Sequence, residues 1–185
     1  MKKCVAYIDG GSRGNPGIAG YGVAVLNETG QRIASLSETL GIRTNNFAEY
    51  SALIGALEYA KSHGYDGITI FADSELLVKQ IQGTYKVKSL DLKPLYDQAK
   101  TLISKLKHFS IRHVPREQNR EADRLANLAM DRSVQPASPN PESPTSRQVL
   151  AVYRAGCFRP LEPAEFEENA RFCLMITPAD GGVEM

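Results

Sequence analysis

Tryptophan is absent from the 185 residues, and the chain contains only three cysteines. Cys4, Cys157 and Cys173 are too few and too scattered for a disulfide framework or a zinc cluster, so a reducing, cytoplasmic compartment is expected. The sequence has no hydrophobic run long enough to cross a membrane, and only VAYI separates MKKC from Asp9, which leaves no room for a signal peptide. We therefore expect no membrane association.

The chain also lacks a strong net charge, which is +1 overall. That average hides an asymmetry, because residues 1–132 contain 18 Lys and Arg against 14 Asp and Glu, whereas residues 147–185 contain 4 against 6. If several acids of the first segment are gathered in one site, the rest of its surface is basic. Such a surface suits a polyanion held around an acidic centre.

The order of apolar patterns predicts an α/β domain over residues 1–132. Alternating and continuous apolar runs predict five strands, at residues 4–9, 21–26, 31–40, 68–73 and 109–114. Helical spacing predicts four helices, at residues 46–63, 75–82, 92–107 and 119–132. Asn45 or Asn46 is the expected N-cap of the first helix. Together they predict a five-stranded mixed sheet, three antiparallel strands plus two parallel, with helices on both faces.

The composition changes after residue 132. Four prolines between Pro136 and Pro144 lie among Ser, Asn and Thr, and they predict a semi-rigid extended linker over residues 133–146. Residues 147–185 form a short C-terminal extension with two apolar patches, and a helix is expected at residues 163–170. Three roles stay open for this extension: docking of a partner, packing that stabilises the first domain, or a passive appendage.

Four acids occupy positions that an ordinary solvated surface does not explain. Asp9 ends the first predicted strand, before a glycine-rich loop, and Asp73 ends the fourth strand, where ligands bind in open α/β sheets. Glu49 and Asp123 lie on the inward stripes of two helices, where a charge is costly unless it is paired or bound to metal. Each acid alone has a plainer explanation, such as a turn residue or a favourable helix N-terminus.

A cluster of four carboxylates would repel itself and raise its own pKa values, so it needs compensating cations. The sequence places no lysine or arginine at these four positions, and all-oxygen ligand sets suit Mg²⁺ or Mn²⁺. Two such ions about 3.5–4 Å apart form the clamp used for in-line phosphodiester displacement. The pattern therefore predicts phosphodiester chemistry if the four acids converge.

Four segments resemble type 1 ribonuclease H in order and spacing across residues 1–132: DGGSRGNPGIAGYG, TNNFAEYSALIGAL, FADSELLVKQI and VPREQNREADRLANLA. The resemblance implies a ribonuclease H-like sheet and hydrolysis of the RNA strand of RNA–DNA hybrids, leaving 5′-phosphate and 3′-hydroxyl ends. It also implies a monomer with two Mg²⁺ ions per site, with Mn²⁺ as an alternative. The catalytic and metal-binding acids of the family fall on Asp9, Glu49, Asp73 and Asp123.

The resemblance also implies substrate contacts, at Gly10, Gly11, Asn15, Thr44, Asn45 and Asn46. The asparagine amides can donate to and accept from 2′-hydroxyls in the minor groove of a hybrid, and the glycines let the backbone approach an RNA sugar. Thr44 matches a contact to a DNA phosphate. For each asparagine alone, a turn or cap is the simpler explanation, and the two roles can coexist.

Two features of many bacterial members of that family are missing. Their Trp-rich basic protrusion is reduced to GTYKVKSLDLK, in which Lys86 and Lys88 remain, so we expect weaker and more salt-sensitive binding of the hybrid. Their loop histidine is absent from PREQNREAD, and Arg116, Glu117 and His113 are the candidates to replace it.

Two other functions stay open at this point. The first is a non-catalytic nucleic-acid binding module, which predicts that one of the four acids is missing. The second is a related polynucleotidyl transferase or a nuclease of double-stranded RNA.

Overall fold

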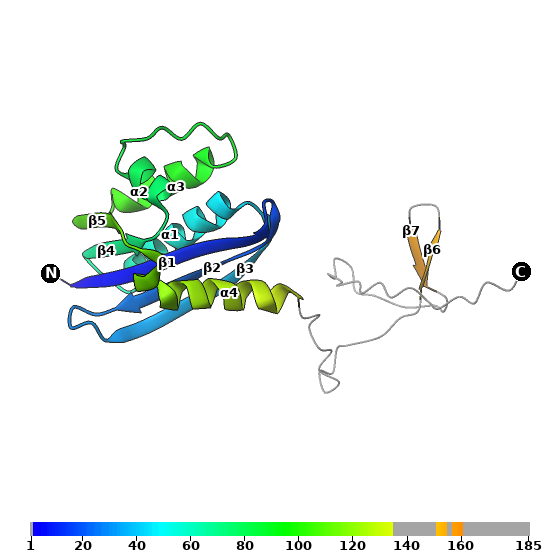
Figure 1. Ribbon diagram of the computed structural model, residues 1–185, viewed down its shortest axis with the longest axis horizontal. Helices are drawn as coiled ribbons and strands as arrows, with labels where there is room; N and C mark the ends of the chain where they lie inside the picture. Colours follow the sequence, from blue (N-terminus) through cyan, green and yellow to red (C-terminus); the bar gives the residue numbers. More distant parts are fainter. Residues whose placement is uncertain (1, 135–150, 155–156, 161–185) are drawn as a thin grey trace, which may run out of the picture. The chain divides into compact units, whose positions relative to one another are not determined.

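The computed structural model describes residues 2–134, 151–154 and 157–160 (Figure 1). The chain divides into two units, residues 1–138 and residues 139–185, and each is described by itself. In the second unit β6 (Ala151–Arg154) and β7 (Cys157–Pro160) pair antiparallel, which the sequence did not predict. The helix expected at residues 163–170 lies outside the described residues. The division of the chain at residues 132 and 146 stays a prediction.

Five strands form one mixed sheet with the order β3-β2-β1-β4-β5. Their bounds are β1 (Lys3–Gly14), β2 (Gly17–Leu26), β3 (Arg32–Arg43), β4 (Gly67–Ala72) and β5 (His108–His113). The first three strands pair antiparallel, whereas β4 pairs parallel with both β1 and β5. The predicted fold class is therefore confirmed.

β1 continues beyond the residue at which the sequence predicted its end. Its parallel pairing with β4 stops at Ile8, opposite Ala72, but its antiparallel pairing with β2 continues from Asp9 to Gly14. The expected glycine-rich loop after Asp9 is therefore wrong, because these residues still have β2 as a hydrogen-bonding neighbour. Asp9 lies where β1 loses one of its two neighbouring strands, which leaves room beside it.

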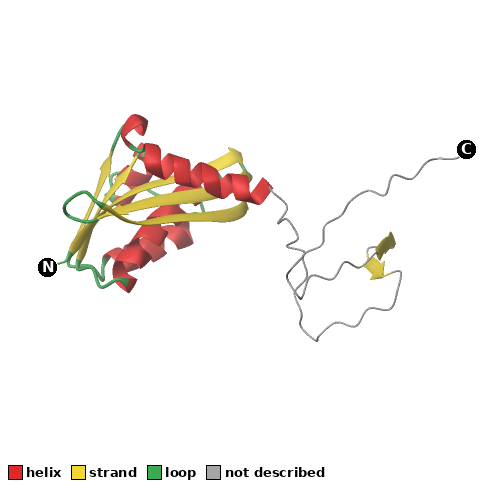
Figure 2. Ribbon diagram, turned by 90° about the horizontal axis from the view of Figure 1, so that it is seen from below, coloured by secondary structure: helices red, strands yellow, loops and turns green. Residues whose placement is uncertain are grey.

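Helices cover both faces of the sheet (Figure 2). They are α1 (Asn45–Ser62), α2 (Glu75–Ile81), α3 (Lys93–Ile103) and α4 (Arg120–Val134). Neighbouring residues of β2 point to opposite faces, so Tyr21 packs against Gly55 of α1 while Gly22 lies against Ala122 of α4. None of the helices in the described part of the chain is long and apolar enough to span a membrane.

The ends of two helices differ from the prediction. Thr44 is the N-cap of α1, and its Oγ1 accepts a hydrogen bond from the Phe47 N–H at 3.3 Å, whereas Asn45 and Asn46 already belong to the helix. α3 ends at Ile103 instead of residue 107. Lys107 donates its N–H to the Asp66 carbonyl at 2.8 Å, which turns the chain away from the helix axis and into β5.

The contact between β2 and α4 leaves no room for a side chain at Gly22. A Cβ atom there would overlap the backbone of Ala122 and Ala126. We expect Gly22→Ala to lower the free energy of unfolding by about 1–3 kcal/mol, because two backbones must separate. Urea unfolding measures this loss, and faster amide hydrogen exchange in α4 locates it.

Gly30→Ala is the control for this substitution, because Gly30 has φ +81 and a Cβ atom added there would meet no other atom within 4 Å. It strains a turn without touching α4, so α4 should keep its hydrogen-exchange rates. Unchanged exchange in Gly22→Ala would contradict the close-packing argument.

Candidate active site

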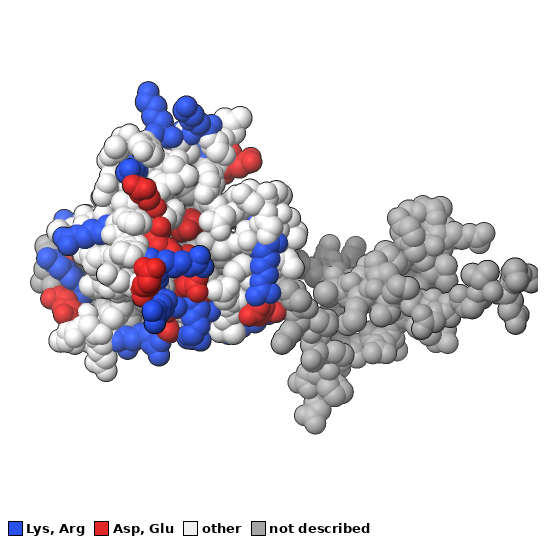
Figure 3. Space-filling model, in the orientation of Figure 1, with Lys and Arg blue, Asp and Glu red and all other residues white. Residues whose placement is uncertain are grey.

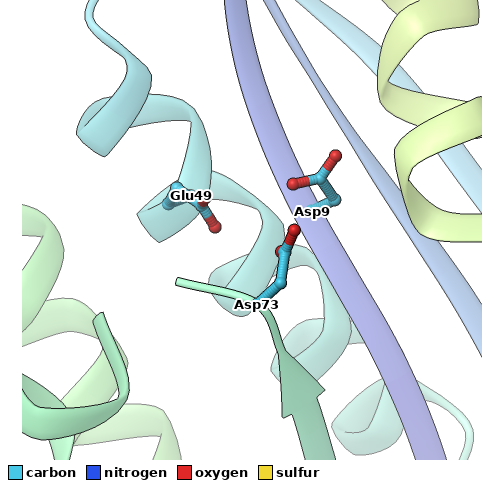
Figure 4. A group of neighbouring side chains, drawn as sticks. All are labelled: Asp9, Glu49 and Asp73. Atoms are coloured by element: carbon cyan, nitrogen blue, oxygen red, sulfur yellow. The ribbon is translucent and has the colours of Figure 1, made fainter. Parts of the chain in front are cut away.

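Three of the four predicted acids converge. Asp9, Glu49 and Asp73 each offer a carboxylate oxygen, and these oxygens all lie within 4.8 Å of one another. Asp9 comes from β1, Glu49 from the first turns of α1, and Asp73 directly follows β4 (Figure 4). The C-terminal end of β4 and the start of α1 thus meet beside the point where β1 and β4 separate. We call these three residues the acidic trio.

Gly10 brings α1 close enough for Glu49 to join Asp9. A Cβ atom at Gly10 would overlap the backbone of Ala48 and Glu49. The backbone of β1 therefore touches the backbone of the helix directly, next to both acids. The sequence assigned Gly10 to the approach of an RNA sugar, and the structure gives it this packing role as well.

Asp123 lies in the same pocket but outside the trio. Its Oδ1 accepts a hydrogen bond from Arg116 Nη2 at 2.6 Å, and its Oδ2 accepts one from Asn127 Nδ2 at 3.1 Å. A basic side chain, which the sequence did not place beside the four acids, therefore accompanies Asp123. Arg116 belongs to a short 3₁₀ helix, η1 (Arg116–Gln118), whose position at the rim the sequence pattern does not reveal.

Of the three candidates to replace the loop histidine, Arg116 lies at the pocket and the other two do not. Arg116 lines the pocket and binds Asp123. Glu117 and His113 are exposed and lie outside the lining of this pocket. Arg116 is thus the candidate placed to act on the acids.

The pocket has an acidic floor and a mixed rim. It is lined by Asp9, Gly10, Gly11, Ser12, Arg13, Asn45, Glu49, Asp73, Arg116, Asp123, Asn127 and Met130. Figure 3 shows acidic side chains gathered at the middle of this face, with basic side chains beside them. The sequence predicted no role for Ser12, Arg13, Asn127 or Met130. Helical spacing could have found Asn127, because it lies one turn after Asp123 on the same face.

The six predicted substrate contacts lie at or near the pocket. Gly10, Gly11 and Asn45 line it. Asn15 is tied to them, since its Oδ1 accepts a hydrogen bond from the Asn45 N–H at 3.2 Å. Thr44 and Asn46 are exposed neighbours of Asn45 in the chain and are outside the lining.

Burial and mutual repulsion raise the pKa values of Asp9 and Glu49. Asp9 is 8% exposed, and its burial, followed by the charges of Asp73 and Asp123, raises its pKa to about 7. Arg116 and the Gly10 N–H act in the opposite direction. Burial raises the pKa of Glu49 well above its ordinary value, and the nearby Asp9 and Asp73 carboxylates add to the shift.

The trio fits a divalent cation. Glu49 Oε2 is buried, and no described residue donates a hydrogen bond to it. A buried carboxylate oxygen without a partner is costly, and a hard cation with oxygen ligands would satisfy it. The donor set of the trio contains only oxygen, as Mg²⁺ and Mn²⁺ prefer.

Comparison with known proteins places the chain in a family. Residues 7–129 match the family described as Reverse transcriptase-like. A ribonuclease H of Ruthia magnifica subsp. Calyptogena magnifica is 35% identical over 146 residues, covering 71% of this chain and 98% of the relative. Ribonuclease HI of Halobacterium salinarum is 44% identical over 126 residues, covering 68% and 63%. The chain belongs to the type 1 ribonuclease H family.

The structural comparison agrees with this ribonuclease H assignment. The crystal structure of LC11-RNase H1 in complex with an RNA/DNA hybrid has 40% sequence identity and a TM-score of 0.68, covering 71% of this chain and 99% of that one. The chain spans 42% of the length of the bifunctional protein Rv2228c of Mycobacterium tuberculosis, to which it is 43% identical.

The raised pKa values predict that stability in EDTA falls as the pH rises. The Asp9 carboxyl has a higher pKa in the folded state, about 7, than in the unfolded chain, so the folded state binds more protons between these values. Unfolding free energy should therefore decrease from pH 5 to pH 8, by about 2–3 kcal/mol from Asp9 alone. Urea unfolding at pH 5, 6.5 and 8 measures this slope.

Asp9→Asn removes the titrating group, so it should flatten the slope and raise stability at pH 8. Asp97→Asn, an exposed change that disturbs only the ion pair with Lys93, should follow the parent protein. An Asp9→Asn protein with the parent slope would show that this carboxyl does not hold a proton at neutral pH.

Proposed function

We propose that this protein is a metal-dependent endonuclease that hydrolyses the RNA strand of RNA–DNA hybrids. The observation that carries the proposal is the acidic trio, three carboxylates within 4.8 Å of one another with Glu49 Oε2 left without a donor. Family membership and the hybrid complex of LC11-RNase H1 support the choice of substrate.

Asp9, Glu49, Asp73 and Asp123 are the proposed catalytic and metal-binding residues. The trio would hold a divalent ion, and Asp123 would complete the site for a second ion. Two Mg²⁺ ions, or Mn²⁺ in their place, would supply activation of water and stabilisation of the leaving 3′ oxygen. Departure of that oxygen leaves a 3′-hydroxyl and a 5′-phosphate.

The residues of the chain itself prepare this chemistry in two ways. Gly10 keeps α1 against β1, so Asp9 and Glu49 stay together without reorganisation during the reaction. Arg116 holds Asp123 and adds a positive charge at the rim, where a phosphodiester anion would approach the acids. The Arg116 side chain is 74% exposed, so its guanidinium can exchange the carboxylate for phosphate.

The proposed substrate contacts form one surface beside the acids. The Asn15–Asn45 hydrogen bond joins the β1–β2 turn to the start of α1, which holds both amides near the pocket. These amides, with Asn46 and the backbone of Gly10 and Gly11, suit the 2′-hydroxyls of a minor groove. Thr44 suits a DNA phosphate and also caps α1, so the two roles coexist.

Replacing one acid tests the catalytic assignment. Asp73→Asn should reduce cleavage of a hybrid by at least about 10³-fold, because the metal clamp contributes several kcal/mol to the transition state. Binding of the hybrid in EDTA should stay near the parent value. Asp97→Asn is the matched control, since it makes the same chemical change at an exposed site on α3. Wild-type activity in Asp73→Asn would overturn the assignment.

A substrate panel tests the reaction itself. The protein is incubated with Mg²⁺ or Mn²⁺ and with a hybrid, an RNA duplex and a DNA duplex of the same sequence. Cleavage confined to the RNA strand of the hybrid, with products that polynucleotide kinase labels only after phosphatase treatment, is the expected result. Cleavage of the RNA duplex would indicate a double-stranded-RNA nuclease, and binding without cleavage a non-catalytic module.

The binding surface and cellular setting are proposed as follows. Lys86 and Lys88 are exposed, and with few other charges in this segment we expect weak binding of the hybrid, because phosphate contacts supply most of the non-specific affinity. We propose a monomer that acts in the cytoplasm, where the buried thiol of Cys4 would stay reduced.

A further inference from the structure

Asn119 is a buried polar residue that the sequence pattern did not connect with the acids. It is 1% exposed, at the residue before α4. Its Nδ2 donates one hydrogen bond to the Ile8 carbonyl at 2.8 Å and a second to Asp73 Oδ1 at 2.9 Å. Both hydrogen bonds cross large sequence separations, so they join three distant parts of the chain.

The orientation of the Asn119 amide follows from its partners. A carbonyl and a carboxylate both accept hydrogen bonds, so only the NH₂ group can face them. Its Oδ1 is buried and has no donor among the described residues. The two N–H bonds therefore determine the side-chain position.

Asn119 acts at the place where the sheet divides. The parallel ladder between β1 and β4 ends at Ile8 and Ala72, and the next residues are Asp9 and Asp73. Because the ladder ends here, the Ile8 carbonyl needs a hydrogen-bond donor from outside β4. The side-chain amide of Asn119 supplies that donor. The same amide holds Oδ1 of the Asp73 carboxylate, which lies beside the carboxylates of Asp9 and Glu49.

Asn119 is also tied to the fourth acid. Its backbone carbonyl accepts a hydrogen bond from the Asp123 N–H at 3.0 Å, and this bond closes the first turn of α4. One residue therefore contacts the segments that carry Asp9, Asp73 and Asp123. A shift of α4 would move all three contacts together.

We propose that Asn119 is a positioning residue, which fixes the Asp73 carboxylate for metal binding and couples its place to β1 and α4. The proposal rests on the metal-dependent function proposed above. A purely structural role would instead stabilise the fold without changing the affinity of the site for metal.

Two substitutions separate the lost hydrogen bonds from lost packing. Asn119→Ala removes the donors and leaves a void, whereas Asn119→Leu removes the donors and keeps most of the volume. Leu125→Ala is the control, because Leu125 is buried on α4 (4% exposed) and its loss opens a void without touching Asp73. Thermal unfolding in EDTA measures how much each change costs in stability.

The deciding measurement is calorimetric titration of each full-length protein with MnCl₂ alone. Both Asn119 variants should bind Mn²⁺ about 10–100-fold more weakly than the parent, the loss typical when the partner of a metal ligand is removed. Leu125→Ala should bind Mn²⁺ with the parent affinity, even where its melting temperature is lower. Binding of a hybrid in EDTA should be similar in all four proteins.

The outcomes distinguish the two proposals. If the parent binds Mn²⁺ and cleaves hybrids while the Asn119 variants keep the parent Mn²⁺ affinity, only the positioning role is overturned. If Leu125→Ala loses as much affinity as the Asn119 variants, general loosening of α4 explains the effect and the proposal also fails. If the parent neither binds Mn²⁺ nor cleaves a hybrid, the proposed function itself fails.

Discussion

The repulsion between buried carboxylates is the constraint on which this structure depends. Asp9 and Glu49 are almost fully buried and lie beside Asp73, an arrangement that disfavours the charged forms of Asp9 and Glu49. This placement costs folding free energy above the ordinary pKa of the two acids, as the raised pKa values of Asp9 and Glu49 indicate. Proteins retain such local conflicts where function requires them, and the surrounding structure must hold the groups in place.

The fold meets that requirement with backbone contacts more than with salt bridges. Gly10 lets α1 touch β1, and Gly22 lets α4 touch β2, so both helices approach the sheet as closely as their backbones allow. The positions of Glu49 and Asp123 are therefore fixed by main-chain packing on opposite faces. Rigid elements of this kind hold a site more accurately than flexible loops.

Much of the site could be predicted from the sequence because it follows simple periodicities. The phase of the helix placed Glu49 toward the core, and the apolar run of β4 placed Asp73 at its end. Comparable reasoning was wrong about the length of β1, because the glycines after Asp9 indicate a loop when the pairing with β2 is unknown. The sequence pattern of a single strand does not show which of its two edges stays paired with a neighbouring strand.

The rest of the site depends on contacts that no periodicity in the sequence predicts. Arg116 reaches Asp123 through the geometry of a 3₁₀ turn, and Asn119 reaches Ile8 across 111 positions of sequence. Neither contact leaves a periodic signal. The sequence therefore predicts which acids belong to the site but not which neutral and basic side chains hold them. The extension beyond residue 146 keeps the three roles proposed for it.

The place of α4 in the chain has a consequence for biosynthesis. All five strands of the sheet and the three acids of the trio precede it, and Arg116, Asn119 and Asp123 leave the ribosome after them. A nascent chain can pair its strands before α4 covers the face of β2 at Gly22. The proposed site would then be completed only as α4 docks, so a polypeptide that still lacks α4 would not yet cut the nucleic acids around it.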